Sequence, residues 1–252
     1  MAPTTEWTQL YNQKRTWIRC PNDLNAYFSD KEVCGKAIDQ ISLGEISFPT
    51  GEILARDPLT YMSRDQQPYL QKVPAGKYEA EACIILPENG NYARFAAVRV
   101  CFTNHPALYH EEALTGEEDL VHLREGEYFG FNVDAGLACV CDVKVRDAFC
   151  DFMDEWEQER PGDNLYDDYF SSLFVLNSRM NPKYQSNGGN WINWKIPNTD
   201  YSLPIFPSGF GDGAYPMYFG YDARGKICQI VVQFIDIELA YQKNDPEQET
   251  EI

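Results

Sequence analysis

The stretch SGFGDGAYPMYFGYDARGKICQIVVQFIDI, residues 208–237, decides the fold that we expect for this chain of 252 residues. Two apolar runs, 215–221 and 227–237, are joined by a short polar loop that ends in Gly225. Aromatic and β-branched runs on either side of such a loop predict a β-hairpin. The second run has almost no polar interruption, which is typical of a strand buried on both faces. We therefore place this hairpin in the centre of a sheet.

Further strands are predicted upstream of the hairpin. Alternating or apolar runs bounded by turn residues indicate strands at 45–48, 51–55, 78–86, 94–103 and 128–140, the last interrupted at 134–136. The runs 78–86 and 94–103 are separated by a Pro-Glu-Asn-Gly turn and form a second predicted hairpin.

Helical periodicity is clearest after Asp142, whose side chain can cap a helix with Val145, Phe149 and Trp156 on one face. Apolar spacing also predicts helices at 4–18, 29–37 and 165–177, and a helical turn at 107–114. These elements indicate one α+β domain over residues 1–242, with two helices packed on a mostly antiparallel sheet. The polar residues 243–252 are predicted to form a disordered acidic tail.

Composition restricts the function. The chain has 39 acidic residues against 21 Lys and Arg, a net charge of −18, which repels nucleic acid and attracts a basic partner or a metal ion. Solubility alone also explains such a charge. No run is apolar enough for a spanning helix, and residues 1–17 lack the apolar stretch of a secretory signal, so we expect a cytosolic protein without membrane contact. The eight cysteines include no CxxC pair, which favours reduced, buried thiols.

Four aspartates are candidates for catalysis, because each lies beside Gly or Pro near a predicted strand end. Converging carboxylates serve general acid–base catalysis or bind a hard metal ion. The competing interpretation is ordinary turn chemistry, in which each carboxylate accepts hydrogen bonds from nearby backbone amides. The four residues are Asp57, Asp134, Asp142 and Asp212.

The glycine-rich loop is the candidate binding segment, made of Ser208, Gly209, Phe210, Gly211, Asp212 and Gly213. Its backbone amides can surround an anion, although it matches neither a P-loop nor a dinucleotide fingerprint. A structural turn that requires positive φ is the alternative. His105, His110 and His122 lie in one acidic segment without metal-ligand spacing, so we expect a solvated loop and no metal site there.

Several blocks occur in a set order between Gly44 and Ile237: PTGEI (49–53) with DPL (57–59), VPAGKY (73–78), VDAG (133–136) with Cys141-Asp142, SGFGDGAYP (208–216) and FGYDARG (219–225). Together they resemble the domain-of-unknown-function family numbered 4241, which usually carries Trp where this chain has Phe210. The resemblance implies one intact domain of bacterial origin and supplies no mechanism. Some small acidic families of this kind act as immunity proteins against toxins.

We therefore expect a non-enzymatic protein-binding domain of the immunity or antitoxin type, whose partner is a basic protein such as a toxin. The alternative is a hydrolase in which the four aspartates act with Mg²⁺ or Ca²⁺. No cofactor is predicted, because no cofactor motif is present.

Overall fold

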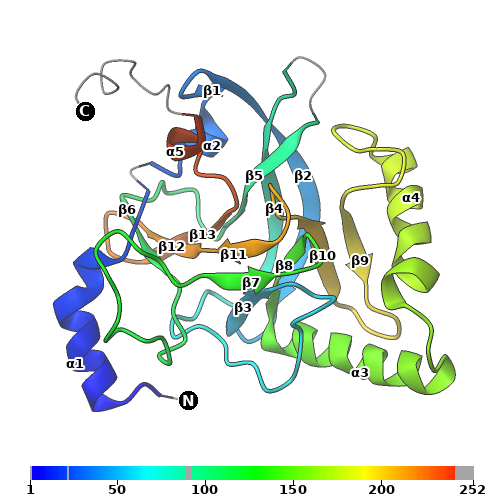
Figure 1. Cartoon of the computed structure of the whole chain (residues 1–252), viewed down its shortest axis with the longest axis horizontal. Coiled ribbons are helices and arrows are strands. Elements are labelled where there is room, and N and C mark those ends of the chain that lie inside the picture. Colours follow the sequence, from blue (N-terminus) through cyan, green and yellow to red (C-terminus); the bar gives the residue numbers. More distant parts are fainter. Residues whose placement is uncertain (1, 22, 89–91, 242–252) are drawn as a thin grey trace, which may run out of the picture.

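The strands form three antiparallel sheets in a computed structural model that describes residues 2–21, 23–88 and 92–241 (Figure 1). The main sheet has the spatial order β1 (Glu32–Val33), β2 (Lys36–Phe48), β4 (Gly76–Ile85), β5 (Arg94–Cys101), β13 (Ile227–Gln233), β12 (Met217–Tyr221) and β6 (Tyr109–Glu112). The second sheet has the order β3 (Ile53–Arg56), β8 (Leu137–Asp142), β10 (Ser202–Pro207) and β9 (Ile192–Lys195). A third sheet pairs β11 (Gly213–Tyr215) with β7 (Phe131–Val133).

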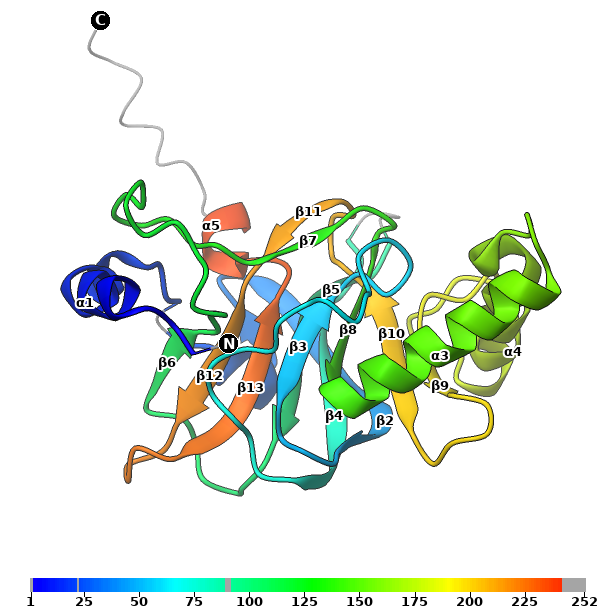
Figure 2. The same ribbon diagram turned by 90° about the horizontal axis from the view of Figure 1, so that it is seen from below.

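Helices surround these sheets (Figures 1 and 2). At the N-terminal end, α1 (Thr5–Lys14) continues into a short 3-10 helix, η1 (Arg15–Trp17), and α2 (Ala26–Ser29) follows. The long α3 (Val143–Glu159) is followed by a π-helical turn, η2 (Tyr166–Phe170), which leads into α4 (Ser171–Met180). The described part of the chain closes with α5 (Ile237–Tyr241), and none of its helices is long and apolar enough to cross a membrane.

The second sheet is buried on both faces, which makes the fold three layers deep. On β3 and β8, Ile53, Ala55 and Val140 belong to the core shared with the main sheet. The intervening Leu54 and Cys141 belong to the core formed with α3, η2 and α4. Alternate side chains of a strand point to opposite faces, so two buried faces require the nearly continuous apolar runs seen in the sequence. The predicted α+β fold with two helices on a sheet is confirmed.

The predicted central hairpin is confirmed, since β12 and β13 pair with each other and each has a second neighbour. Its second strand ends at Gln233, and Ile237 already begins α5. Two helical predictions are wrong. Residues 29–37 contain β1 and the start of β2, and residues 107–114 contain β6, which pairs with β12. Pairing partners distant in sequence override the weak local helical spacing there. The predicted tail, 243–252, lies outside the described residues.

Asp142 connects the three layers. Its Oδ2 accepts hydrogen bonds from the backbone amides of Thr50 (2.8 Å) and Gly51 (2.9 Å) and from the Thr50 hydroxyl (2.9 Å). Its Oδ1 accepts one from the amide of Lys144 (3.0 Å), which caps α3 as the sequence predicts. Residues 49–52 carry the chain from β2 in the main sheet to β3 in the second sheet. One carboxylate therefore holds this crossing against the start of the helical layer.

Replacing Asp142 with Ala should lower the free energy of unfolding by at least about 3 kcal/mol, because it leaves a buried amide without a partner and removes a helix cap. Urea unfolding followed by circular dichroism measures this loss. Asp134→Ala is the matched control, because the Asp134 side chain is exposed. It should change stability by no more than about 0.5 kcal/mol. Equal effects of the two substitutions would contradict the connecting role of Asp142.

Candidate functional site

Asp57 lies where β3 ends, against the loop between β7 and β8. It is fully buried, and its Oδ2 accepts hydrogen bonds from the amides of Asp134 (3.0 Å) and Ala135 (2.6 Å). The next residue of that loop, Gly136, accepts a hydrogen bond from the amide of Ser208 (3.1 Å). The fold thus brings the sequence blocks that contain Asp57, Asp134 and Ser208 together, through hydrogen bonds donated by backbone amides.

Asp142 lies at the opposite end of the β3–β8 pair, since Ile53 pairs with Asp142 and Arg56 with Cys139. The side chains of Asp134 and Asp212 are exposed. The four predicted aspartates therefore do not meet in one cleft. Across the described ranges, no three His, Cys, Asp or Glu side chains are placed to hold a metal ion.

The glycine-rich loop 208–213 is held by two hydrogen bonds to one of its own carbonyl groups. The Ser208 hydroxyl and the Tyr215 hydroxyl both donate to the carbonyl of Gly211, each at 2.7 Å. Phe210 is 57% exposed, and the Arg94 guanidinium lies 5.0 Å from its ring centre. These contacts account for the loop as a structural turn that presents one aromatic side chain, while its role in binding stays a prediction.

Sequence reasoning missed the strand β6, where two acid–base groups are buried. His110 was expected in a solvated loop, but it is buried and its Nε2 lies 2.9 Å from Gln229 Nε2. An amide donor there requires an unprotonated Nε2, in agreement with the burial that lowers the pKa of His110 to about 4. His105 and His122 are exposed, as expected. The two-residue spacing of His110 and Glu112 fits one face of a strand, but spacing alone does not indicate that the face is buried.

Glu112 differs from the other buried acids. Its Oε1 accepts hydrogen bonds from the amides of Phe129 (2.9 Å) and Gly130 (2.7 Å). Its Oε2 is buried and has no hydrogen-bond partner in the part of the chain that the structure describes. Burial raises the pKa of this carboxyl to about 7, against the lowering effect of the two amides. Glu112 therefore changes its protonation state near neutral pH.

A second feature is an acidic surface where α3 ends. We call it the acidic helix end and define it as Glu155, Glu157, Glu159, Asp163, Asp167 and Asp168, all exposed. These residues form no ion pair with any described residue, whereas Asp151 and Asp154, earlier in α3, both pair with Arg64. The turn from α3 to η2 projects from one corner of the molecule (Figure 1, lower right).

A comparison with protein-family models finds a match over residues 46–232 to the family described as "Protein of unknown function (DUF4241)". No curated protein and no solved structure matches the chain. The match begins near the end of β2 and ends inside β13. It therefore includes β6 and the acidic helix end but not the helices α1, η1, α2 and α5.

Two glycines of the loop should respond differently to substitution. Gly209 and Gly211 have φ angles of +70° and +109°. A Cβ at position 209 would lie 2.9 Å from Phe234 Cβ, whereas position 211 is open. Gly211→Ala should therefore cost about 1 kcal/mol through backbone strain, and Gly209→Ala clearly more. Chemical denaturation measures both costs, and an equal or smaller cost at position 209 would contradict the close packing described here.

Glu112 should make stability depend on pH. Its pKa in the folded state, about 7, exceeds its ordinary value of 4.5, so between these values the folded state holds a proton that the unfolded state has released. Stability from this group is complete below pH 4.5 and is lost as the pH rises through about 7.

Glu112→Gln removes this dependence. The stability of the variant relative to the wild type should rise between pH 5 and pH 8 by up to about 3 kcal/mol, since one pKa unit is worth about 1.4 kcal/mol. Urea unfolding at several pH values measures the difference, in which the contribution of His110 cancels because both proteins carry it. A difference that does not change with pH would contradict the assignment.

Proposed function

Because the chain belongs to the DUF4241 family of proteins of unknown function, and no activity comes with that membership, we propose a function from its surface: it binds a basic protein through the acidic helix end. This binding role does not require the protein to catalyse a reaction. In its most specific form, this is an immunity-type domain that neutralises a basic toxin in the cytosol.

The proposal rests on the distribution of acidic and basic residues between the two ends of α3. Aligned peptide dipoles leave partial negative charge at a helix C-terminus, so acidic side chains there are unfavourable by about 0.3–1 kcal/mol each. The last turn of α3 nevertheless carries Glu157 and Glu159 and no basic residue, and the first turn carries no acidic one after the capping Asp142. Arg160 follows the helix, but its guanidinium lies over the Trp156 ring at 4.5 Å.

Glu157 and Glu159 therefore reduce the stability of α3, so stability does not explain their position. Charges that oppose local stability are typical of functional surfaces. An unpaired acidic surface accelerates encounter with a basic partner and disfavours acidic ones. The hydrolase alternative has no comparable support, because the oxygens of Asp57 and Asp142 accept hydrogen bonds from the protein's own backbone.

The test compares two triple variants that each change the net charge from −18 to −15. The first, E155Q/E157Q/E159Q, neutralises the acidic helix end. The control, E32Q/E117Q/E125Q, neutralises three exposed acids that form no ion pair with the residues described elsewhere in the chain. The partner is captured from extract of the native host with the wild-type protein and identified by mass spectrometry.

With the purified partner, the association rate constant should fall at least tenfold at low salt for the first variant and by less than about twofold for the control. The melting temperature of the first variant should stay the same or rise, because repulsion with the helix dipole is removed. Equal rates for the two variants would refute the proposed surface. A toxin-like gene beside this one would support the immunity form.

A further inference from the structure

A hollow of about 270 Å³ lies where β3 ends beside β7. Figure 2 shows the two strands next to each other. The residues that line the hollow are Arg56, Tyr61, Gln66, Gly130, Phe131 and Asn132. Arg56 is the last residue of β3, and Phe131 and Asn132 begin β7. All six residues lie inside the family match.

Hydrogen bonds to buried side chains fix two walls of the hollow. The carbonyl of Gln66 accepts a hydrogen bond from Nη1 of the buried Arg146 at 2.7 Å. The amide of Gly130 donates to Oε1 of the buried Glu112, also at 2.7 Å. The hollow is therefore part of the folded structure and not a gap between loosely placed loops.

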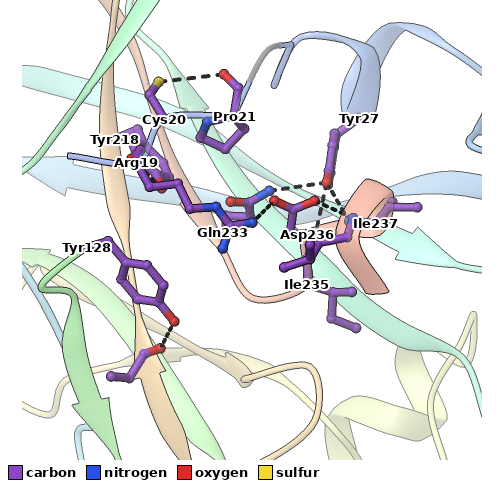
Figure 3. A network of polar contacts seen from close by, with 12 residues as sticks. Arg19, Cys20, Pro21, Tyr27, Tyr128, Tyr218, Gln233, Ile235, Asp236 and Ile237 are labelled. Carbon is purple, nitrogen blue, oxygen red and sulfur yellow. Dashed lines mark hydrogen bonds and ion pairs between the residues drawn. The ribbon is translucent and has the colours of Figure 1, made fainter. Parts of the chain in front are cut away.

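Arg56 supplies the charge in the hollow and differs from the other enclosed arginines. Five arginines are buried or half-buried. Four of them have a carboxylate or an aromatic ring as a partner: Arg19, Arg94, Arg99 and Arg146. Figure 3 shows one of these pairs, in which Arg19 contacts Asp236. Arg56 is half-buried and has neither kind of partner among the described residues.

The guanidinium of Arg56 has donors left for a ligand. Its Nη1 donates to the carbonyl of Ala55 at 2.7 Å. It also lies near the hydroxyl of Tyr69, since burial raises the pKa of Tyr69 and Arg56 lowers it. A guanidinium carries five N–H groups in a planar fork that matches a carboxylate. Removing such a charge from water without an anionic partner is unfavourable, so this arrangement indicates a place for an anion.

Glu112 does not supply that anion, although it binds the amide of Gly130. Arg56 is not among the groups that shift the pKa of Glu112, so the two side chains do not form a pair. The anion therefore has to come from outside the described residues.

The lining favours one carboxylate over a phosphate. Arg56 is the one basic side chain that lines the hollow, so it offers a single positive charge. The net charge of −18 disfavours a dianion at the same place. Tyr61 and Asn132 are exposed and add a hydroxyl and an amide as neutral donors. The ring of Tyr61 also offers an apolar surface to the rest of the ligand.

We propose that this hollow binds a carboxylate, which accepts a bidentate hydrogen bond from the guanidinium of Arg56. Charge-assisted pairs of this kind are the strong ones in proteins, because two parallel bonds add geometric specificity to the attraction. Free carboxylic acids and peptide C-termini present the same group, so these are the two sources to compare. The site does not depend on the acidic helix end, whose partner is basic.

The test is an NMR titration of the isotope-labelled full chain with benzoate, with N-acetylglycine as the model of a peptide C-terminus, and with benzamide as the uncharged analogue of benzoate. Benzoate or N-acetylglycine should bind and shift the amide signals of Gly130 and Asn132. Binding should weaken at least tenfold, about 1.4 kcal/mol, in Arg56→Gln. It should stay unchanged in Arg124→Gln, which removes one exposed charge of the same sign. Which of the two acids binds more tightly identifies the source.

A second variant keeps the test decisive if Arg56→Gln unfolds. Asn132 is exposed and lines the hollow, so Asn132→Trp should fill the hollow and abolish binding. The matched control is Asn12→Trp, at an exposed position of α1, which should bind as the wild type does. The proposal is overturned if benzamide or inorganic phosphate binds as tightly as benzoate, if neither Arg56→Gln nor Asn132→Trp weakens binding, or if the wild type binds neither acid up to about 10 mM.

Discussion

The rest of this structure depends on the hydrogen bonds that Asp142 accepts at the crossing between the two large sheets. Its Oδ2 holds Thr50 and Gly51, where the chain leaves β2 for β3, and its Oδ1 holds the first turn of α3. The amides involved are near or inside the protein interior, so an anionic acceptor offsets the loss of their hydration. Asp57 plays the corresponding part at the other end of β3, where it fixes the loop at Asp134 and Ala135.

These two carboxylates join sequence blocks that lie far apart in the chain. PTGEI contains the amides that Asp142 binds, and VDAG contains the amides that Asp57 binds. A residue type that suits catalysis therefore serves here to join segments distant in sequence. The oxygens of both carboxylates already accept hydrogen bonds from the protein's own backbone, which leaves no acceptor for a substrate.

The residues that match the family model and the residues that flank them form different parts of the structure. The matching residues, 46–232, supply most of both sheets, the helical layer and the acidic helix end. The N-terminal segment lies at the β6 edge of the main sheet, where Cys20 Sγ donates a hydrogen bond to the carbonyl of His110.

The sequence by itself determined the elements whose signals are local. The hairpin of β12 and β13 follows from two apolar runs around a polar turn, and α3 follows from its cap at Asp142 and an apolar stripe. Only the tertiary structure decided the state of β6, because His110 and Glu112 have no local preference for a buried strand and are placed there by pairing with β12. It also decided that Asp57 and Asp142 lie apart and that Oε2 of Glu112 has no hydrogen-bond partner among the described residues. The donors that reach a carboxylate come from residues far away in the chain. Periodicity and composition do not show which of these residues lie close together in space.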